Sequence, residues 1–417
     1  MNRAQKRVVV TGLGVISPCG VDVQSFWNAV VAGQPSAGPV THFPVDQMPV
    51  RIASEVRDYD ASEYMPDSKR RRFDPAIKFG IGAALQALKD SGLDPTSVDP
   101  DRIGVVDGTS VCGLTHMLEA QTRFLSSGYK GIQPSRTVTA FAGACSSEIA
   151  IALGITHSAV TIATACSSGN DALAWGSAKI ADGSADVMIA GAEEAPIVEA
   201  YYSLFTNVGV LSRRNHEPRK AMRPFDEDRD GFVLGEGSAF VILEELSHAL
   251  ARGARIYCEY SGHGQSCDAY SSVSNHPEGK GMKRAIERAL FDAEIPLDEI
   301  DYINCHGSAT EVNEIVETKV YRSVFGRWAE RLQISATKPV TGHLMGATAA
   351  IEAVICALAL FHKTVPPTAN LEKPAEGCDL DYVRGAARRL PLRRALNINL
   401  GFGGKNSALI LSAFDGA

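Results

Sequence analysis

Four residues of this sequence have side chains suited to nucleophilic attack or proton transfer: Cys166, His306, Lys338 and His343. Cys166 lies in the segment Thr-Ala-Cys-Ser-Ser-Gly, after β-branched residues and before an Ala-rich segment of helical period. A thiol directly before a helix is at the positive end of the helix dipole, which favours the thiolate, and small neighbours permit a tight turn. A buried, inert cysteine can have the same surroundings. This local pattern leaves both interpretations open.

The two histidines follow strand-like runs at matching places in the sequence. His306 begins His-Gly-Ser-Ala-Thr, and His343 ends Lys-Pro-Val-Thr-Gly-His. A lone histidine is usually structural, but two histidines and Lys338, each at a strand-to-helix turn, indicate convergence on one pocket. In α/β sheets, ligands bind at that edge of the strands.

Short apolar runs alternate with longer Ala-rich segments, which is typical of an α/β fold with buried strands. The predicted strands are residues 7–11, 102–106, 160–165, 187–190, 238–244, 255–260, 302–305, 332–336, 395–399 and 408–412. The predicted helices are residues 26–32, 75–91, 171–181, 281–293, 311–324 and 346–361. The plan occurs twice, so we predict an internal duplication joined near residues 249–254, with halves 1–252 and 253–417.

Composition excludes several classes of protein. The 417 residues are 45% hydrophobic and 21% charged, as in a soluble protein with a large core. A net charge of -7 gives no general attraction to nucleic acid. The nine cysteines are scattered without a CxxC pair, which argues against a zinc site and against disulfides and favours the cytoplasm.

No segment predicts a signal peptide or a membrane span. The N-terminus enters a strand at Val8 rather than a long apolar signal region. Residues 149–170 lack charged side chains and are long enough to cross a bilayer. Because Gly154 interrupts them and β-branched residues follow, a buried helix, a turn and a buried strand are predicted instead.

Other motifs have structural interpretations. Residues 399–406 lack the first Gly and the final Ser or Thr of a phosphate-binding loop, and Gly12-Leu-Gly14 lacks the third Gly of a dinucleotide fingerprint. Residues 223–232 interleave Arg and Asp, which favours a salt-bridged loop over a metal site. The cationic run at residues 69–72 is either a solvated face or a surface for an acidic partner.

Taken together, the motifs resemble the condensing enzymes of the thiolase superfamily, specifically a type II β-ketoacyl-acyl carrier protein synthase. The resemblance runs from Val8 to Gly404, and four motifs occur in the family's order: residues 164–169, 223–232, 306–310 and 338–343. It implies a duplicated five-layered α-β-α-β-α fold and a homodimer. It also implies no metal or organic cofactor, since the substrates carry phosphopantetheine.

The resemblance also implies residue roles. Cys166 would take an acyl chain from an acyl carrier protein, and a malonyl-carrier would lose CO₂ and attack the acyl-enzyme. Cys166, His306 and His343 match the family's triad, Lys338 supports the histidines and Glu352 pairs with that lysine. We expect the helix N-terminus and a nearby histidine to supply the thiolate, and the imidazoles to stabilise the enolate. The other matches are the oxyanion amides of Cys166 and Phe402; the gate Phe402 with Leu400, Gly401 and Gly403; the pantetheine contacts Ser308 and Thr310; the acyl-pocket residues Val111 and Phe205; and the carrier-docking residues Lys69, Arg70, Arg71 and Arg72.

Departures from the commonest family motifs leave the pathway open between fatty acid and type II polyketide or polyene synthesis. They are Leu400 in place of Phe, Glu311, Lys405 and the pair Val111-Cys112. One alternative is a non-catalytic chain-length partner subunit in a heterodimer, but such partners typically lose the cysteine. A thiolase acting on coenzyme A thioesters would carry a second cysteine near the C-terminus, where this sequence has Phe402. A cysteine hydrolase is the remaining alternative.

Overall fold

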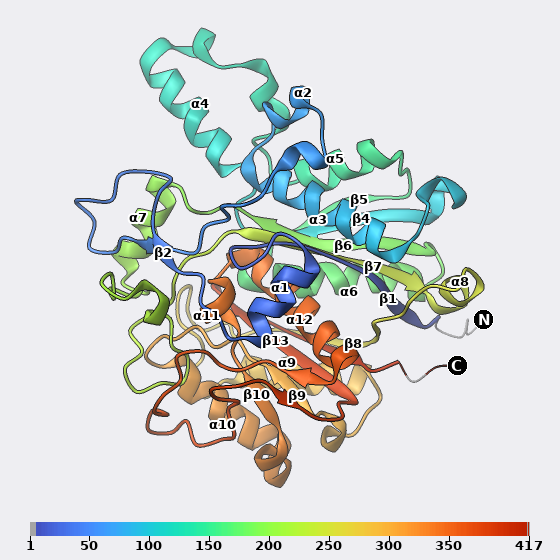
Figure 1. Ribbon diagram of the computed structural model, residues 1–417, viewed down its shortest axis with the longest axis vertical. Helices are drawn as coiled ribbons and strands as arrows, with labels where there is room; N and C mark the ends of the chain where they lie inside the picture. Colours follow the sequence, from blue (N-terminus) through green and yellow to red (C-terminus); the bar gives the residue numbers. More distant parts are fainter. Residues whose placement is uncertain (1–5, 415, 417) are drawn as a thin grey trace.

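Strands and helices alternate along the chain in the computed structural model, which describes residues 6–414 and 416 (Figure 1). The strands are β1 (Val8–Ile16), β2 (Gly38–Pro39), β3 (Ile52–Ala53), β4 (Ile103–Gly108), β5 (Ala159–Ile162), β6 (Val187–Glu194), β7 (Gly237–Glu245), β8 (Cys258–Cys267), β9 (Tyr302–Asn304), β10 (Gln333–Ser335), β11 (Thr364–Val365), β12 (Arg388–Arg389), β13 (Arg394–Gly401) and β14 (Lys405–Ser412). The helices are α1 (Val23–Val31), α2 (Asp67–Arg70), α3 (Pro75–Ser91), α4 (Leu114–Ser127), α5 (Ala144–Leu153), α6 (Ser168–Ala181), α7 (Glu199–Val208), α8 (Leu246–Ala251), α9 (Lys280–Asp292), α10 (Asn313–Phe325), α11 (Lys338–Thr341) and α12 (Thr348–His362).

The strands form two halves with the same order. The ten-stranded sheet runs β10-β9-β13-β14-β8-β1-β7-β6-β4-β5. In each half the first strand in sequence pairs with the last, and from that pair the order continues outward to the sheet edge through the fourth, second and third strands. The halves meet where residues 8–10 of β1 pair antiparallel with residues 258–260 of β8. This repeated order is what an internal duplication produces.

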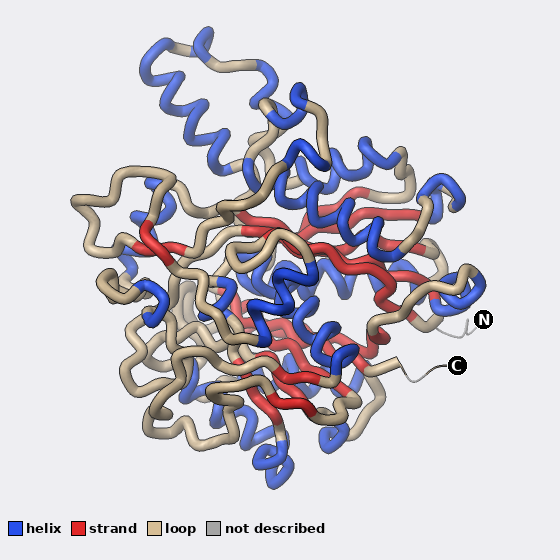
Figure 2. Tube along the Cα trace, viewed as in Figure 1, coloured by secondary structure: helices blue, strands red, loops and turns tan. Residues whose placement is uncertain are grey.

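Helices lie between and outside the two half-sheets (Figures 1 and 2). α6 and α12 pack against each other in the middle layer and contact strands of both halves. α3 and α5 cover the outer face of the N-terminal half, and α9 with α10 covers the C-terminal half. The arrangement confirms the predicted five-layered α/β fold.

All ten predicted strands of the large sheet and all six predicted helices are present, with shifted ends. β1 is longer than expected because it continues through Gly12 and Gly14, the two glycines of the incomplete dinucleotide-binding motif. A Cβ on Gly14 would lie 1.9 Å from the carbonyl oxygen of Ala83, so glycine lets α3 lie directly on the strand. All nine cysteines are free, in agreement with the prediction that the chain has no disulfide framework.

The helices that were not predicted include α4 and α7. α4 projects from the body of the molecule, and Phe124 and Leu125 on it are exposed. A core helix is predicted from apolar residues that recur on one face of the helix. α4 was missed because it does not bury such a face in the core.

Two apolar segments are long enough to be considered as membrane spans. Residues 149–170 contain the end of α5, a turn, β5 and the start of α6, so the predicted helix, turn and strand are present. The prediction that they are buried is wrong, because Ile151 is 67% exposed and no residue of β5 is buried. Met345–His362 is long and apolar enough to cross a membrane, but 89% of this window is buried inside the protein. It contains α12, the helix of the middle layer.

Candidate active site

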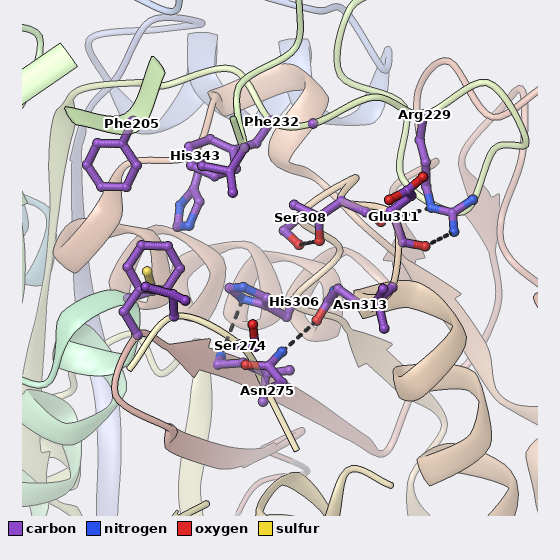
Figure 3. Close-up of a pocket in the computed structure, with 18 of the residues that line it drawn as sticks. Phe205, Arg229, Phe232, Ser274, Asn275, His306, Ser308, Glu311, Asn313 and His343 are labelled. Atoms are coloured by element: carbon purple, nitrogen blue, oxygen red, sulfur yellow. Dashed lines mark hydrogen bonds between the residues drawn. The ribbon is translucent and has the colours of Figure 1, made fainter. Parts of the chain in front are cut away.

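A cavity of about 570 Å³ brings together residues from both halves of the fold (Figure 3). Its walls include the thiol residue Cys166, the imidazoles of His306 and His343, and the rings of Phe205 and Phe402. The predicted convergence of the cysteine and the two histidines on one pocket is therefore present in the structure.

The backbone around Cys166 forms a tight turn before α6. Cys166 is the middle residue of a short 3-10 turn, Ala165–Ser167, and is 4% exposed. The Ser168 hydroxyl donates to the carbonyl oxygen of Ala165 at 2.7 Å and accepts from the N–H of Thr164 at 2.9 Å. These bonds fix the turn and place the thiol directly at the N-terminus of α6.

The pKa of the Cys166 thiol is raised, whereas the sequence analysis expected it to be lowered. Burial raises the pKa of Cys166 to about 12, and the Lys338 charge and the backbone N–H groups of Phe402 and Cys166 only partly oppose it. Removal from water therefore outweighs the favourable neighbours, so these surroundings do not favour the expected thiolate. The same two N–H groups are those expected to form the oxyanion hole.

Both imidazoles are neutral. Burial, and next the Lys338 charge, lower the pKa of His306 and of His343 well below the usual range. The rings meet edge to face with centroids 5.7 Å apart. His306 Nδ1 accepts from the Leu400 N–H at 3.4 Å, which leaves the proton on Nε2. His343 Nδ1 lies 2.9 Å from Thr348 Oγ1 at the start of α12.

Lys338 lies behind the histidines in a buried ion pair. Its Nζ donates to Glu352 Oε1 at 2.7 Å and also to the carbonyl oxygen of His306, and both charged side chains are fully buried. Burial raises the pKa of Glu352 to about 7, against the opposing effect of Lys338. Lys338 thus holds the His306 backbone and keeps the imidazoles neutral from outside the cavity.

Two buried glutamates on α10 hold the His306 loop and were missed in the sequence. Glu317 accepts the N–H groups of His306 and Gly307 at 3.0 and 2.8 Å. Glu314 accepts the N–H of Ala309 at 2.5 Å and lies 3.4 Å from Arg229 Nε. Their spacing could have indicated them, because two glutamates three residues apart on the predicted helix lie on the same face.

The segment of residues 223–232 is a salt-bridged loop, as predicted. Arg223 pairs with Asp226 at 3.2 Å, and both side chains are buried. Arg229 also donates to the carbonyl oxygen of Thr310 at 2.9 Å. The loop therefore supports the wall of the cavity that follows His306.

The lining of the cavity includes both hydroxyl groups and aromatic rings. Ser308 and Thr310 line the cavity, and their hydroxyl oxygens are 3.1 Å apart. The Phe402 ring stacks on Phe205 with centroids 6.0 Å apart. Leu400 is buried and also lines the cavity.

Gly401 and Gly403 flank Phe402, the expected gate, whereas Val111 lies apart from the cavity. Gly401 ends β13, and Gly403 follows Phe402 with a left-handed φ of 81°. Val111 does not line the cavity, and its N–H donates to Glu194 Oε1 at 2.9 Å.

The cationic run lies on the surface around α2 rather than in the cavity. Lys69 pairs with Glu148 at 3.1 Å, and Arg70 pairs with Asp67. Arg71 lies 3.8 Å from the same carboxylate and is 75% exposed. Arg72 is exposed and has no ion pair among the described residues. Part of the positive charge is therefore neutralised within the chain.

Comparison with known proteins identifies the family. A model described as "Beta-ketoacyl synthase, N-terminal domain" matches residues 5–249, and "Beta-ketoacyl synthase, C-terminal domain" matches residues 257–372. The chain belongs to the beta-ketoacyl synthase family. A curated relative, 3-oxoacyl-(acyl-carrier-protein) synthase 2 of Synechocystis sp., is 40% identical over 413 residues, covering 99% of each chain.

Two solved structures resemble this beta-ketoacyl synthase throughout. One is a type II PKS acyl-carrier protein in complex with its ketosynthase bound to the hexaketide, with 33% identity, a TM-score of 0.91 and coverage of 99% and 100%. The other is the ishigamide ketosynthase/chain length factor, with 32% identity, a TM-score of 0.92 and the same coverage. These matches confirm the family and the fold that the motifs indicated.

Proposed function

We propose that this protein catalyses decarboxylative Claisen condensation of an acyl thioester with malonyl-acyl carrier protein. The product is a β-ketoacyl-acyl carrier protein two carbons longer, in fatty acid or type II polyketide or polyene synthesis. One observation carries the proposal: the Cys166 thiol, two neutral imidazoles and two N–H groups directed at the sulfur share one cavity. The substrates carry phosphopantetheine, and the reaction needs no further cofactor.

The first half-reaction transfers the acyl group to Cys166. Because burial keeps the thiol protonated, the proton leaves as the sulfur attacks, and a neutral imidazole in the cavity is the acceptor. The N–H groups of Cys166 and Phe402 stabilise the negative oxygen of the tetrahedral intermediate. The carrier thiol leaves with that proton, and the Cys166 thioester remains.

The second half-reaction uses the histidines as donors. Loss of CO₂ from the malonyl group leaves an enolate whose oxygen accepts from Nε2–H groups of His306 and His343. In a water-poor cavity this stabilisation is strong. The enolate carbon attacks the acyl carbonyl, the Cys166 sulfur leaves as a thiolate, and the thiolate takes up one proton from solvent. Ser308 and Thr310 would bind the pantetheine arm, and Phe402 against Phe205 would gate the acyl pocket.

The alternative functions receive less support. A chain-length partner subunit has no use for the thiol that Cys166 provides. A thiolase would need a second thiol at the cavity, where Phe402 lies instead. We propose a cytoplasmic homodimer, or a heterodimer with a related ketosynthase-like subunit, because β5 is the open edge of the sheet and apolar Phe141 and Ile151 are exposed.

The test is the intact mass of carrier proteins after incubation with acyl-carriers of several lengths and malonyl-carrier. A mass increase equal to one β-keto extension of the acyl chain is expected. Free acid with unextended carrier would identify a hydrolase. Acetoacetyl-coenzyme A formed without any carrier would identify a thiolase.

Carrier docking should depend on Arg71 and Arg72, the two residues of the cationic run that are most free to meet an acidic partner. Replacing both with Glu should raise the apparent KM for carrier-bound acyl substrate by about tenfold and weaken its salt dependence. Lys69 is less suitable for this test because Glu148 already pairs with it.

The control for this substitution has two parts. The same reversal at exposed Arg327 and Arg331 of the C-terminal half should leave the KM nearly unchanged. Small pantetheine thioesters should react equally well with both variants. Equal losses with carrier and small substrates would mean that the run at α2 is structural.

A further inference from the structure

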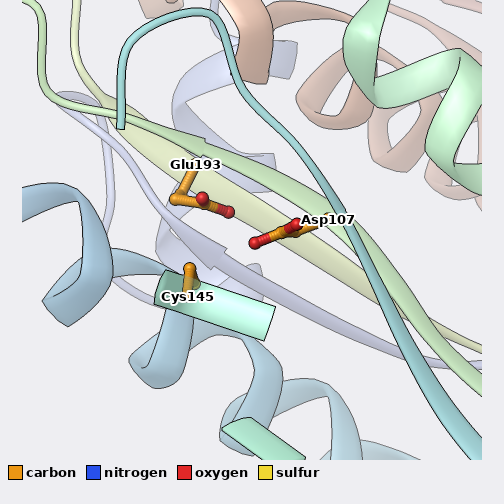
Figure 4. A group of neighbouring side chains, drawn as sticks. All are labelled: Asp107, Cys145 and Glu193. Atoms are coloured by element: carbon orange, nitrogen blue, oxygen red, sulfur yellow. The ribbon is translucent and has the colours of Figure 1, made fainter. Parts of the chain in front are cut away.

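A second cluster of ionisable side chains lies in the outer core of the N-terminal half (Figure 4). It consists of Asp107 on β4, Glu193 on β6 and Cys145 at the start of α5. One carboxylate oxygen from each acid and the Cys145 sulfur all lie within 4.8 Å of one another. All three side chains are fully buried, and none lines the cavity of the proposed active site.

The Glu193 carboxyl group has no partner outside the cluster. Apart from Asp107 and Cys145, no group donates a hydrogen bond to either of its oxygens, and Oδ1 of Asp107 likewise has no outside partner. Within residues 6–414, no lysine, arginine or histidine pairs with either acid. The neighbouring Glu194, on the opposite face of β6, accepts backbone N–H groups from Ser110, Val111 and Gly346. Because an unpaired buried carboxylate is strongly unfavourable, Glu193 lacks a ligand that its surroundings do not supply.

The surroundings orient these groups toward one point. The N–H of Ser146 donates to Asp107 Oδ2 at 2.9 Å, which leaves Oδ1 facing the cluster. The two carboxylates point at each other, with Cys145 reaching them from α5 (Figure 4). On α3, a Cβ at Gly80 would lie 2.2 Å from the Cys145 sulfur, so glycine leaves the room that the sulfur occupies.

We propose that Asp107, Cys145 and Glu193 bind a zinc-class divalent cation in a structural site. Zinc takes thiolate and carboxylate ligands together, whereas magnesium and calcium take oxygen ligands only. Bond lengths of about 2.0–2.3 Å require the three ligand atoms to approach by about 1 Å, with a water or hydroxyl as fourth ligand. The thiol releases its proton to solvent as the metal binds.

The bound ion would join α5 to two strands of the N-terminal half. β4 leads into residues 109–111. Glu194 accepts hydrogen bonds both from this segment and from the N–H of Gly346, in the turn before α12. The site therefore has a structural role that is independent of the condensation reaction. No sequence motif indicates the site, because its three ligands are 38 and 48 residues apart, outside any short ligand motif.

The test measures metal in the full-length chain, produced with added zinc and purified without a metal-affinity tag or chelator. About one zinc per chain is expected by mass spectrometry of the elements. Protein produced with cobalt should show a thiolate-to-cobalt charge-transfer band. Removing the metal should lower the Tm by several degrees, and zinc should restore it.

Variants locate the site. Glu193→Gln and Cys145→Ser should lose the metal and the zinc-dependent rise in Tm. Cys258→Ser removes an equally buried thiol outside the cluster and should retain both. A wild-type chain without stoichiometric metal and without a cobalt–thiolate band would overturn the proposal, whether or not the variants fold. Equal metal in wild type and both cluster variants would also overturn it, and the acids would then share a proton instead.

Discussion

Replacing Cys166 with alanine should lower acyl transfer by at least about 10⁴-fold, while malonyl-carrier decarboxylation stays within about tenfold of the wild type. In the proposed mechanism the thiol forms the acyl intermediate, whereas the two imidazoles stabilise the enolate. Acyl incorporation is measured by peptide mass mapping, and decarboxylation by CO₂ release.

The control uses Cys267, an exposed thiol whose Sγ lies 3.8 Å from the Gly403 carbonyl oxygen in the gate loop. Cys267 is more accessible than Cys166, so it would be acylated first if accessibility decided the site. Cys267→Ala should leave acyl transfer nearly unchanged. Acyl mass on Cys267 with Cys166 free would reject Cys166 as the nucleophile.

The burial of this thiol is a property that its local sequence pattern does not predict. A strand, a tight turn and a helix are local features, and the turn around Cys166 was predictable from its small residues. Burial by Phe402 and by the rest of the cavity depends on contacts between distant segments. That burial, which raises the pKa of the thiol to about 12, cannot be read from the local pattern.

The fold was more predictable than the contacts that support the site. Ten strands and six helices followed from apolar runs and helical periodicity, because most of them bury apolar side chains in the hydrophobic clusters. The hydrogen bond from Leu400 to His306 joins residues 94 positions apart, and no periodicity indicates it. The carboxylates of Glu314 and Glu317 likewise act on backbone groups of another segment.

The duplicated fold explains why the reactive residues meet. Cys166 lies in the 3-10 turn Ala165–Ser167 before α6, and the corresponding turn before α12 is Met345–Ala347, which closely follows His343. Because α6 and α12 pack together in the middle layer, their N-terminal turns lie side by side. His306 then reaches the same point from the end of β9. A repeated local plan thus becomes a single composite site only when the two halves are packed together.

His306→Ala and His343→Ala should each lower malonyl-carrier decarboxylation by about 10²–10³-fold, the usual loss for one oxyanion donor. Some acylation of Cys166 should remain in each variant, because the N–H groups at the sulfur are unchanged. His116→Ala is the matched control, since His116 is also a buried imidazole with a lowered pKa of about 4 but lies outside the cavity. Unchanged CO₂ release in both active-site variants would reject the role of the imidazoles.

The pH dependence of decarboxylation gives a second measurement of the same role. Since burial and Lys338 hold the pKa values of both histidines well below the usual range, the imidazoles stay neutral as the pH falls through 6.5. Wild-type CO₂ release should therefore be nearly flat from about pH 7.5 to 6. The paired substitution Lys338→Met with Glu352→Gln removes both buried charges together, so neither is left unpaired. It should shift the acid limb of the pH profile to higher pH. The limb should stay below pH 6.5, because burial, the larger cause of the lowered histidine pKa values, remains. An acid limb near pH 6.5 in the wild type, or one that the paired substitution leaves in place, would contradict this account of how Lys338 acts.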